Sequence, residues 1–196
     1  MKIGLYGGTF SPPHLGHIRA ARCFVDGVGL DKLIIMPAGI PPHKAVLDPI
    51  PNEKRFEMSK IAFSEIGEVS DYEMNKEGAS FTYLTVRWLK TRYDGDIYLC
   101  MGEDMFLCLD KWREARELFS SCHIVCLKRD ESSYLEIERK KNEFEREYDA
   151  DITVLSYEPL PASSTEIREK IKKGENLDLL LSDKVAEYIL NNKLYI

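Results

Sequence analysis

The chain has 196 residues, and its 33 acidic and 27 basic side chains give a formal charge of -6. An apolar fraction of 44% excludes a largely disordered chain, and the length fits one α/β domain. The acidic balance argues against general binding to nucleic acid or to an anionic membrane, because both need a basic surplus. It leaves room for an anionic small ligand held by a few local cations.

The sequence shows neither a membrane span nor a secretion signal. No stretch approaches the roughly 20 apolar residues that a span needs, and glycines interrupt the N-terminal segment early. The five cysteines form no CxxC pair, and we expect a cytoplasmic protein. Cys122, His123 and Cys126 could ligate a metal. However, the residues between them resemble a buried strand whose alternate side chains point to opposite faces, so we expect no metal site.

Predicted strands and helices alternate along the chain. In chain order we expect strand 3–6, helix 15–28, strand 32–36, helix 53–64, strand 68–72, helix 81–92, strand 96–101, helix 111–119, strand 123–128, helix 134–148, strand 152–155, and helices 164–173 and 182–192. The helix at 134–148 is highly charged and has few apolar anchors, which indicates a peripheral position.

Continuous apolar strands that alternate with helices predict an α/β fold. We expect a doubly wound, Rossmann-like parallel sheet with helices on both faces, in a single domain over residues 1–196. In such sheets ligands bind at the carboxyl ends of the strands.

Three common enzyme signatures are missing from the sequence. There is no GxxxxGK[ST] motif, and the first turn contains Gly4-x-x-Gly7-Gly8 instead of GxGxxG, which argues against a P-loop enzyme and a dinucleotide-dependent dehydrogenase. No serine or cysteine arrangement suits a hydrolytic nucleophile.

The first strand runs instead into an unusual turn. The segment reads Gly7-Gly8-Thr9-Phe10-Ser11-Pro12-Pro13-His14-Leu15-Gly16-His17. Glycines let backbone amides approach a ligand, and Gly16 allows close approach at the helix start. His14 and His17 are three residues apart, so they share one face of the first helical turn, at the positive end of the helix dipole. This combination predicts a polyphosphate site.

A second segment near the end of the chain also opens a helix. It reads Pro161-Ala162-Ser163-Ser164-Thr165-Glu166-Ile167-Arg168. Ser163 and Glu166 have the spacing of a capping box. The same hydroxyls and amides could bind phosphate, with Arg168 as the cation one turn into the helix. The two roles are compatible.

These two segments resemble the HxGH and S-S-T-x-I-R motifs of the nucleotidyltransferase superfamily. The resemblance implies in-line attack by a substrate phosphate on the α-phosphorus of ATP, release of pyrophosphate, and no covalent intermediate. It implies His14, His17 and Arg168 as catalytic residues, with helices from about residue 163 completing the ATP site. Mg²⁺ would arrive with ATP, because no set of protein ligands for a metal is visible. The ATP-binding residues implied in these two segments are Gly7, Gly8, Thr9, Phe10, Gly16, Ser163, Ser164 and Thr165.

Segments in the middle of the chain resemble the bacterial nicotinate-nucleotide adenylyltransferases within that superfamily. They are Pro37-Ala38-Gly39-Ile40-Pro41-Pro42-His43-Lys44, Ala79-Ser80-Phe81-Thr82, Met101-Gly102-Glu103-Asp104 and Leu109-Asp110-Lys111-Trp112-Arg113. The resemblance implies that Lys44 binds a substrate phosphate, that amides near Phe81 and Thr82 face the nicotinate carboxylate, and that Gly102 and Asp104 bind the ATP ribose.

The last of these segments would contribute Trp112 and Arg113 to the pyridine pocket, with Trp112 stacked on the ring. Three simpler roles stay open: Lys44 as an exposed loop lysine, Ser80 as a helix N-cap, and Trp112 as a core residue.

Three residues depart from the family pattern. Ser11 stands where an aspartate is usual, Phe81 replaces a tyrosine, and Arg113 replaces an aromatic residue. The first removes a charge beside the triphosphate, the second loses a hydroxyl group, and the third changes the rim of the pyridine pocket.

The resemblance implies an enzyme of NAD biosynthesis, which joins ATP and nicotinate mononucleotide to give deamido-NAD and pyrophosphate. Two alternatives keep the chemistry but change the acceptor to nicotinamide mononucleotide or to phosphopantetheine. A third is a catalytically silent nucleotide-binding module. The sequence leaves formation of a homo-oligomer open.

Overall fold

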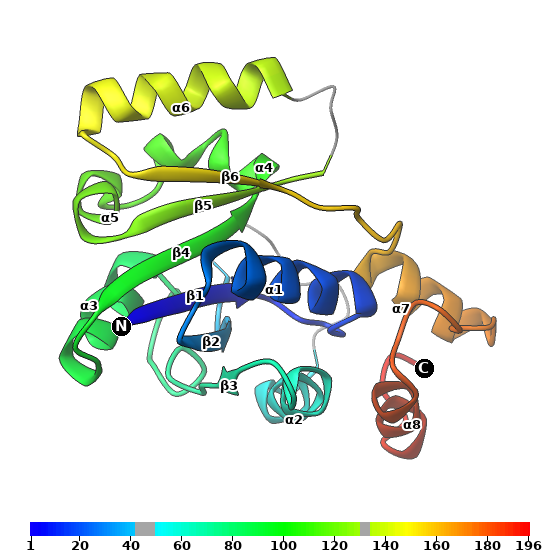
Figure 1. Cartoon of the computed structure of the whole chain (residues 1–196). Helices are drawn as coiled ribbons and strands as arrows, with labels where there is room; N and C mark the ends of the chain where they lie inside the picture. The colour runs from blue at the N-terminus through cyan, green and yellow to red at the C-terminus, as the bar shows by residue number, and fades with distance from the viewer. Residues whose placement is uncertain (42–49, 130–133) are drawn as a thin grey trace. The chain divides into compact units, whose positions relative to one another are not determined.

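A computed structural model describes residues 1–41, 50–129 and 134–196. Its strands form one six-stranded sheet in the order β3-β2-β1-β4-β5-β6, with helices around it (Figure 1). The pairs β1–β4, β4–β5 and β5–β6 are parallel. The prediction of a Rossmann-like parallel α/β fold is therefore confirmed.

Most predicted elements lie within two residues of their observed bounds. The strands are β1 (Lys2–Gly8), β2 (Lys32–Pro37), β3 (Glu68–Val69), β4 (Asp96–Gly102), β5 (His123–Lys128) and β6 (Ile152–Ser156). The helices are α1 (Leu15–Val28), α2 (Asn52–Phe63), α3 (Thr82–Arg92), α4 (Glu103–Phe106), the 3₁₀ turn η1 (Leu109–Lys111), α5 (Ala115–Ser121), α6 (Tyr134–Tyr148), α7 (Ser164–Lys173) and α8 (Asp183–Asn191). Within the described ranges, no helix combines the length and the apolar character that crossing a membrane requires.

The helix predicted at residues 111–119 is wrong. Glu114 adopts the left-handed conformation (φ 57°, ψ 39°) and Trp112 is extended (φ -72°, ψ 151°), so no helix can pass through them. The structure has η1 before this break and α5 after it, so that Trp112 lies in a connection. The short helix α4 was not predicted.

Strand β3 is shorter than the predicted strand at residues 68–72. The Ser70 hydroxyl accepts the N–H of Tyr72 at 3.3 Å, and the Asp71 carbonyl accepts that of Met74 at 3.0 Å. These local bonds turn the backbone away from an extended path.

The chain forms two compact units. The first consists of Met1–Gly7, Cys23–Ile34 and Phe81–Glu158, and the second of Gly8–Arg22, Ile35–Ser80 and Pro159–Ile196. In the first unit α3 packs against α5, and α5 packs against α6. Helix α6 buries Ile137 and Phe144, and the Phe144 ring contacts Phe119 and Phe106 at centroid distances of 4.8 and 5.5 Å. The charged helix is therefore anchored by a small number of apolar side chains.

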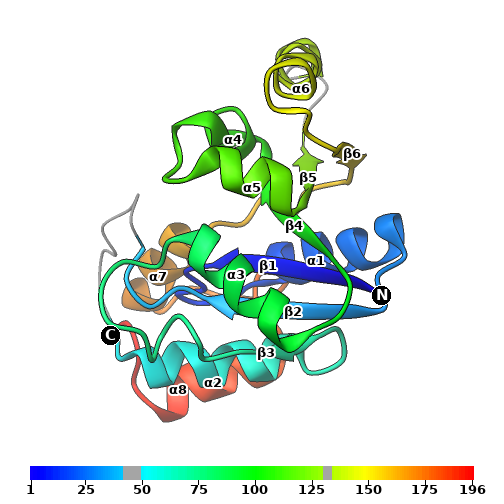
Figure 2. The same ribbon diagram turned by 90° about the vertical axis from the view of Figure 1, so that its left-hand side faces the viewer.

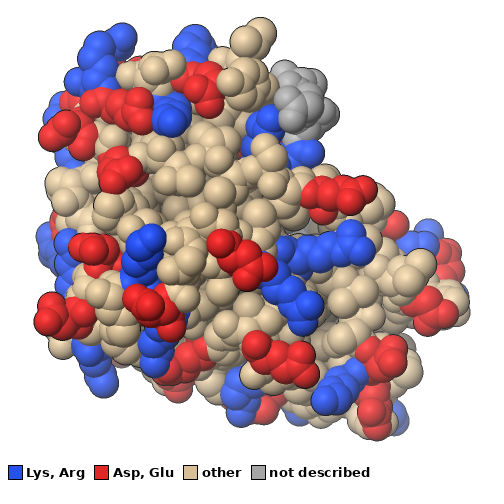
Figure 3. Space-filling view, in the orientation of Figure 1, with Lys and Arg blue, Asp and Glu red and all other residues tan. Residues whose placement is uncertain are grey.

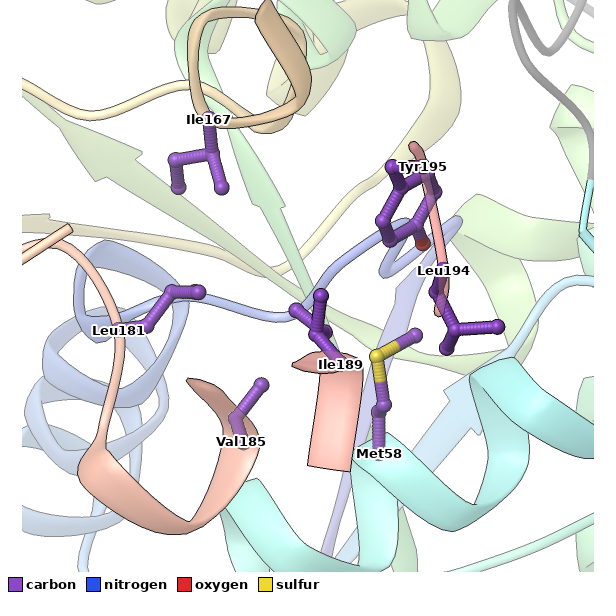
Figure 4. Packing of buried hydrophobic residues seen from close by; sticks show 7 residues of the cluster. All are labelled: Met58, Ile167, Leu181, Val185, Ile189, Leu194 and Tyr195. Atoms are coloured by element: carbon purple, nitrogen blue, oxygen red, sulfur yellow. The ribbon is translucent and has the colours of Figure 1, made fainter. Parts of the chain in front are cut away.

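The second unit has a core in which the C-terminal segment takes part. Helices α2 and α8 lie side by side (Figure 2). Figure 4 shows the cluster that joins them to α7 and to the end of the chain, namely Met58, Ile167, Leu181, Val185, Ile189, Leu194 and Tyr195. Because Leu194 and Tyr195 are buried, the end of the chain is a structural part of this unit.

The cysteines are free thiols, and three of them are buried in the strands or beside them. Burial raises the pKa of Cys122 and of Cys126 to about 12, so both thiols are protonated at neutral pH and act as small apolar side chains. On the face shown in Figure 3, acidic and basic side chains are interspersed.

The anchoring of α6 predicts a large effect of Phe144. Phe144→Ala is expected to lower the free energy of unfolding by about 3–5 kcal/mol, because it removes a fully buried ring from a packed cluster. Urea denaturation followed by circular dichroism measures the change. Leu135→Ala on the same helix is the control, since Leu135 is 80% exposed and should change stability by about 0.5 kcal/mol or less. Equal effects of the two variants would contradict the packing of α6.

Candidate active site

The backbone after β1 carries the first predicted motif, and Phe10 determines its path. Phe10 has φ 48°, in the left-handed region, and its side chain is 1% exposed. Its ring meets the edge of His17 at 5.1 Å and of Phe63 at 5.3 Å between centroids. A Cβ at position 8 would lie 2.7 Å from this ring, so only glycine fits there. The Phe10 side chain is therefore buried, and it packs against the His17 ring of the motif.

The two histidines are stacked at the start of α1. Their ring centroids are 3.7 Å apart with an interplanar angle of 30°. The backbone N–H of His14 donates to Nδ1 of His17 at 3.2 Å. Because Nδ1 accepts this bond, the neutral His17 ring carries its proton on Nε2. His17 therefore presents an N–H donor on the opposite side of its ring.

Gly16 makes room for this stack. A Cβ at position 16 would lie 3.0 Å from two atoms of the His14 ring. The His14 imidazole therefore lies directly beside Gly16, and the predicted approach of a ligand to this glycine stays a prediction.

Helix α7 is attached directly to the histidine segment. The Ser164 hydroxyl donates to the Pro12 carbonyl at 2.9 Å, and Nη1 of Arg168 donates to the Ser11 carbonyl at 2.8 Å. Arg168 is 6% exposed, and its Nη2 donates to the Thr165 hydroxyl at 3.2 Å. Ser163 caps α7, because its hydroxyl accepts the N–H of Glu166 at 3.1 Å. The capping role is confirmed, and the two motifs lie together as predicted.

A second buried arginine, Arg55 of α2, was missed by sequence reasoning. Its Nη1 donates to the Thr9 carbonyl at 2.7 Å, and its Nη2 donates to the Ala38 carbonyl at 2.6 Å. Burial lowers the pKa of Arg55, while the nearby Tyr195 hydroxyl opposes that shift. Arg55 shares the buried face of α2 with Met58 and Phe63. The sequence of α2 has no pronounced apolar face, so no clear signal in it pointed to the burial of Arg55.

The C-terminal segment also reaches this site. The hydroxyl groups of Ser11 and Tyr195 are 3.0 Å apart, within hydrogen-bond distance. Burial raises the pKa of Tyr195 to about 12, against the opposing effects of the Ser11 bond and of the charges of Arg168 and Arg55. Tyr195 is therefore protonated at neutral pH. Ser11, where the family usually has an aspartate, interacts with this neutral hydroxyl.

The segment Ala79–Thr82 differs in one respect from the sequence-based interpretation. Ser80 is not an N-cap: α3 is preceded by Phe81, and the Ser80 hydroxyl accepts the N–H groups of Gly39 and Ile40 at 3.0 and 3.3 Å. Ser80 therefore holds the backbone that follows β2. Lys44, in the same stretch of sequence, lies outside the described residues.

The first unit contains the predicted ribose and pyridine residues. Gly102 precedes α4, and Asp104 is exposed in its first turn. A Cβ at Gly102 would lie 3.2 Å from the guanidinium of Arg129, a cation that sequence reasoning missed. The guanidinium of Arg113 lies 4.8 Å from the centre of the Phe81 ring. These two departures from the family pattern therefore form one cation–π pair.

Trp112 lies beside that pair in the sequence. It follows η1 directly, and its backbone N–H donates to the Leu109 carbonyl at 3.0 Å. The residue is half-buried, so Trp112 is not a fully enclosed core tryptophan.

The predicted residues thus fall into two groups. The second unit contains Gly8, Thr9, Phe10, His14, Gly16, His17, Ser163, Ser164, Thr165 and Arg168. The first unit contains Gly7, Phe81, Thr82, Gly102, Asp104, Trp112 and Arg113. What the second unit offers chemically is a helix start with an imidazole N–H donor and buried cations, which suits a phosphate chain.

Comparison with known proteins agrees with this chemistry. Residues 5–170 match the cytidylyltransferase-like family. The chain is 34% identical over 198 residues to the probable nicotinate-nucleotide adenylyltransferase of Clostridium acetobutylicum, covering 100% of this chain and 99% of that protein. It is 35% identical over 197 residues to the probable enzyme of the same name from Clostridium perfringens strain 13, covering 99% and 98%.

Two solved structures show the same fold. The nicotinic acid mononucleotide adenylyltransferase of Plasmodium falciparum, complexed with NaAD, has a TM-score of 0.71 at 17% identity and covers 99% of this chain and 97% of its own. A putative nicotinate-nucleotide adenylyltransferase from Vibrio parahaemolyticus has a TM-score of 0.69 at 18% identity, covering 99% and 94%. The full-length identity to the clostridial proteins and the family match lead to one conclusion: this chain belongs to the cytidylyltransferase-like family and, within it, to the nicotinate-nucleotide adenylyltransferases.

Proposed function

We propose that this protein joins ATP and nicotinate mononucleotide to give deamido-NAD and pyrophosphate. The observation that carries the proposal is the His14–His17 stack at the start of α1, in which a backbone N–H bonds Nδ1 of His17 and leaves Nε2 as the protonated nitrogen of the neutral ring. The names of the full-length clostridial relatives support the reaction.

In this reaction a phosphate oxygen of the mononucleotide attacks the α-phosphorus of ATP. The bond from the α-phosphorus to the bridging oxygen breaks, and pyrophosphate leaves with that oxygen. Negative charge builds up on the phosphate oxygens, so catalysis needs fixed donors and cations more than a nucleophilic side chain. We assign this role to His14, His17 and Arg168.

The orientation of the backbone after β1 supports an assignment of the ATP contacts. The peptide plane between Thr9 and Phe10 has its carbonyl on Arg55, so the Phe10 N–H points the opposite way. We assign binding of the triphosphate to the backbone of Gly7, Gly8, Thr9, Phe10 and Gly16. Ser163, Ser164 and Thr165 would add hydroxyl and amide groups at the start of α7, and Gly102 and Asp104 would bind the ribose.

The pyridine nucleotide would use residues of the first unit. We propose that Trp112 stacks on the pyridine ring and that Phe81 and Thr82, at the start of α3, offer backbone N–H groups to the carboxylate. The Arg113 guanidinium, held over the Phe81 ring, adds positive charge that favours an acid over an amide. Lys44 stays a predicted phosphate ligand.

Mg²⁺ fits this site only as a companion of the nucleotide. In the portions of the chain that the structure describes, no group of three or more His, Cys, Asp or Glu side chains could hold a metal ion. Mg²⁺ often takes its ligands from substrate phosphates and water. We therefore propose that the ion binds the triphosphate and neutralises part of its charge.

We also propose that the enzyme is a cytoplasmic protein. We propose further that it works as one domain over residues 1–196, which the family match across both units supports.

The proposed function predicts a preference among acceptors. With ATP and Mg²⁺, pyrophosphate release should be much faster with nicotinate mononucleotide than with nicotinamide mononucleotide or phosphopantetheine, because α3 and Arg113 offer donors and charge to a carboxylate. Parallel assays of pyrophosphate measure this directly. Comparable use of the amide would keep the chemistry but refute the carboxylate assignment, and no release with any acceptor would favour a silent binding module.

The assignment of His17 predicts a loss of turnover on substitution. His17→Ala should lower kcat by about 100- to 1,000-fold, since it removes a donor that stabilises charge in the transition state. His123→Ala is the matched control: His123 begins β5, pairs with Asp151, and should leave kcat unchanged. Full turnover by His17→Ala would refute the mechanism.

Trp112 is expected to act on binding more than on chemistry. Stacking is worth roughly 1–3 kcal/mol, so Trp112→Ala should raise KM for nicotinate mononucleotide by about 10-fold while KM for ATP changes little. Trp88→Ala is the control, because Trp88 lies within α3 beneath the Arg92 guanidinium. An unchanged KM in Trp112→Ala would show that the ring does not stack on the substrate.

A further inference from the structure

Arg55 is the most completely buried arginine of the described chain, with 2% of its surface exposed. It projects from the first turn of α2 and does not belong to either motif of the proposed catalytic site. Its guanidinium donates to four oxygen atoms that are all uncharged, on Thr9, Ala38, Gly39 and Asn52. None of these four acceptors carries a negative charge.

The carbonyls that Arg55 holds belong to two separate backbone segments. Thr9 lies between β1 and the stacked histidines, whereas Ala38 and Gly39 follow β2. Each bond is short, at 2.7 Å to Thr9 and 2.6 Å to Ala38. Ala38 also donates its own N–H to the Gly8 carbonyl at 2.9 Å, so the two segments are joined twice.

The segment after β2 is fixed from its other side as well. The Ser80 hydroxyl accepts the N–H of Gly39 at 3.0 Å, and Nη2 of Arg55 donates to the Gly39 carbonyl at 3.2 Å. Both polar groups of this residue are therefore bound to side chains. A guanidinium can donate to several fixed acceptors at once, whereas a lysine ammonium is a compact point charge. An arginine therefore suits this set of acceptors better than a lysine does.

We propose that Arg55 is a positioning residue for nucleotidyl transfer. It fixes the orientation of the Thr9–Phe10 peptide and, through it, the N–H groups and histidines that face the triphosphate. Its positive charge adds to that of Arg168 and favours an anionic ligand on the same backbone. The inference rests on the proposed function for its substrates, but its effect on ATP binding can be measured separately.

The test compares Arg55→Lys and Arg55→Met with a control in the same helix turn. Ser59→Ala is that control, because the buried Ser59 hydroxyl donates at 2.7 Å to the Arg55 carbonyl within α2. Calorimetric titration with MgATP gives Kd, steady-state assays give KM and kcat, and thermal melting gives Tm. Arg55→Met should weaken MgATP binding and lower kcat/KM by about 10- to 100-fold, with Arg55→Lys in between. Ser59→Ala should lower Tm without changing Kd or KM.

A purely structural role would lower Tm in both Arg55 variants while leaving Kd for MgATP and KM unchanged, and that result would overturn the inference. If Arg55→Met does not fold, Arg55→Lys decides by the same two constants. A wild-type protein that binds MgATP but releases no pyrophosphate would refute the proposed function alone. The change in Kd on substitution of Arg55 would then still test the positioning role.

Discussion

The backbone carbonyls of residues 9–12 are the groups on which the site depends. Three side chains from distant parts of the chain hold them: Arg55 binds Thr9, Arg168 binds Ser11, and Ser164 binds Pro12. Pro12 and Pro13 have no N–H to satisfy, so this stretch has few donors that need partners. Of the three peptides held in this way, only Thr9–Phe10 carries an N–H. With the Thr9 carbonyl on Arg55, the Phe10 N–H points to the other side, where an anion can accept it.

The same hydrogen bonds place two positively charged guanidinium groups against this segment. Hydrogen bonds from a charged donor contribute about 1.5–3 kcal/mol each, so the two guanidinium groups hold the segment firmly although the acceptors are neutral. The positive charges of the two guanidinium groups favour a bound triphosphate on the same backbone. The protonated Tyr195 hydroxyl beside Ser11 is compatible with this, because it adds no negative charge where the usual family aspartate would.

Local patterns predicted most of the fold. The apolar periodicity of α1 and the continuous apolar run of β5 predicted the observed bounds of both elements, because burial determines them. The break at Glu114 could not be predicted, since a left-handed glutamate has no signature in the sequence. In the site, the spacing of His14 and His17 was informative, but Arg55 was not identified, because an arginine in a helix usually faces water. The bonds of Ser80, Arg168 and Tyr195 depend on long-range packing, which motif spacing does not encode.

The most direct test is a crystal structure with Mg²⁺ and an ATP analogue that cannot transfer its nucleotidyl group. We expect a triphosphate at the start of α1, with His17 Nε2 within about 3.2 Å of a phosphate oxygen and the Phe10 N–H facing the phosphate chain. The carbonyls of Thr9 and Ser11 should stay on Arg55 and Arg168. A triphosphate bound elsewhere, or a His17 ring with Nε2 turned away from it, would refute the proposed role of this segment.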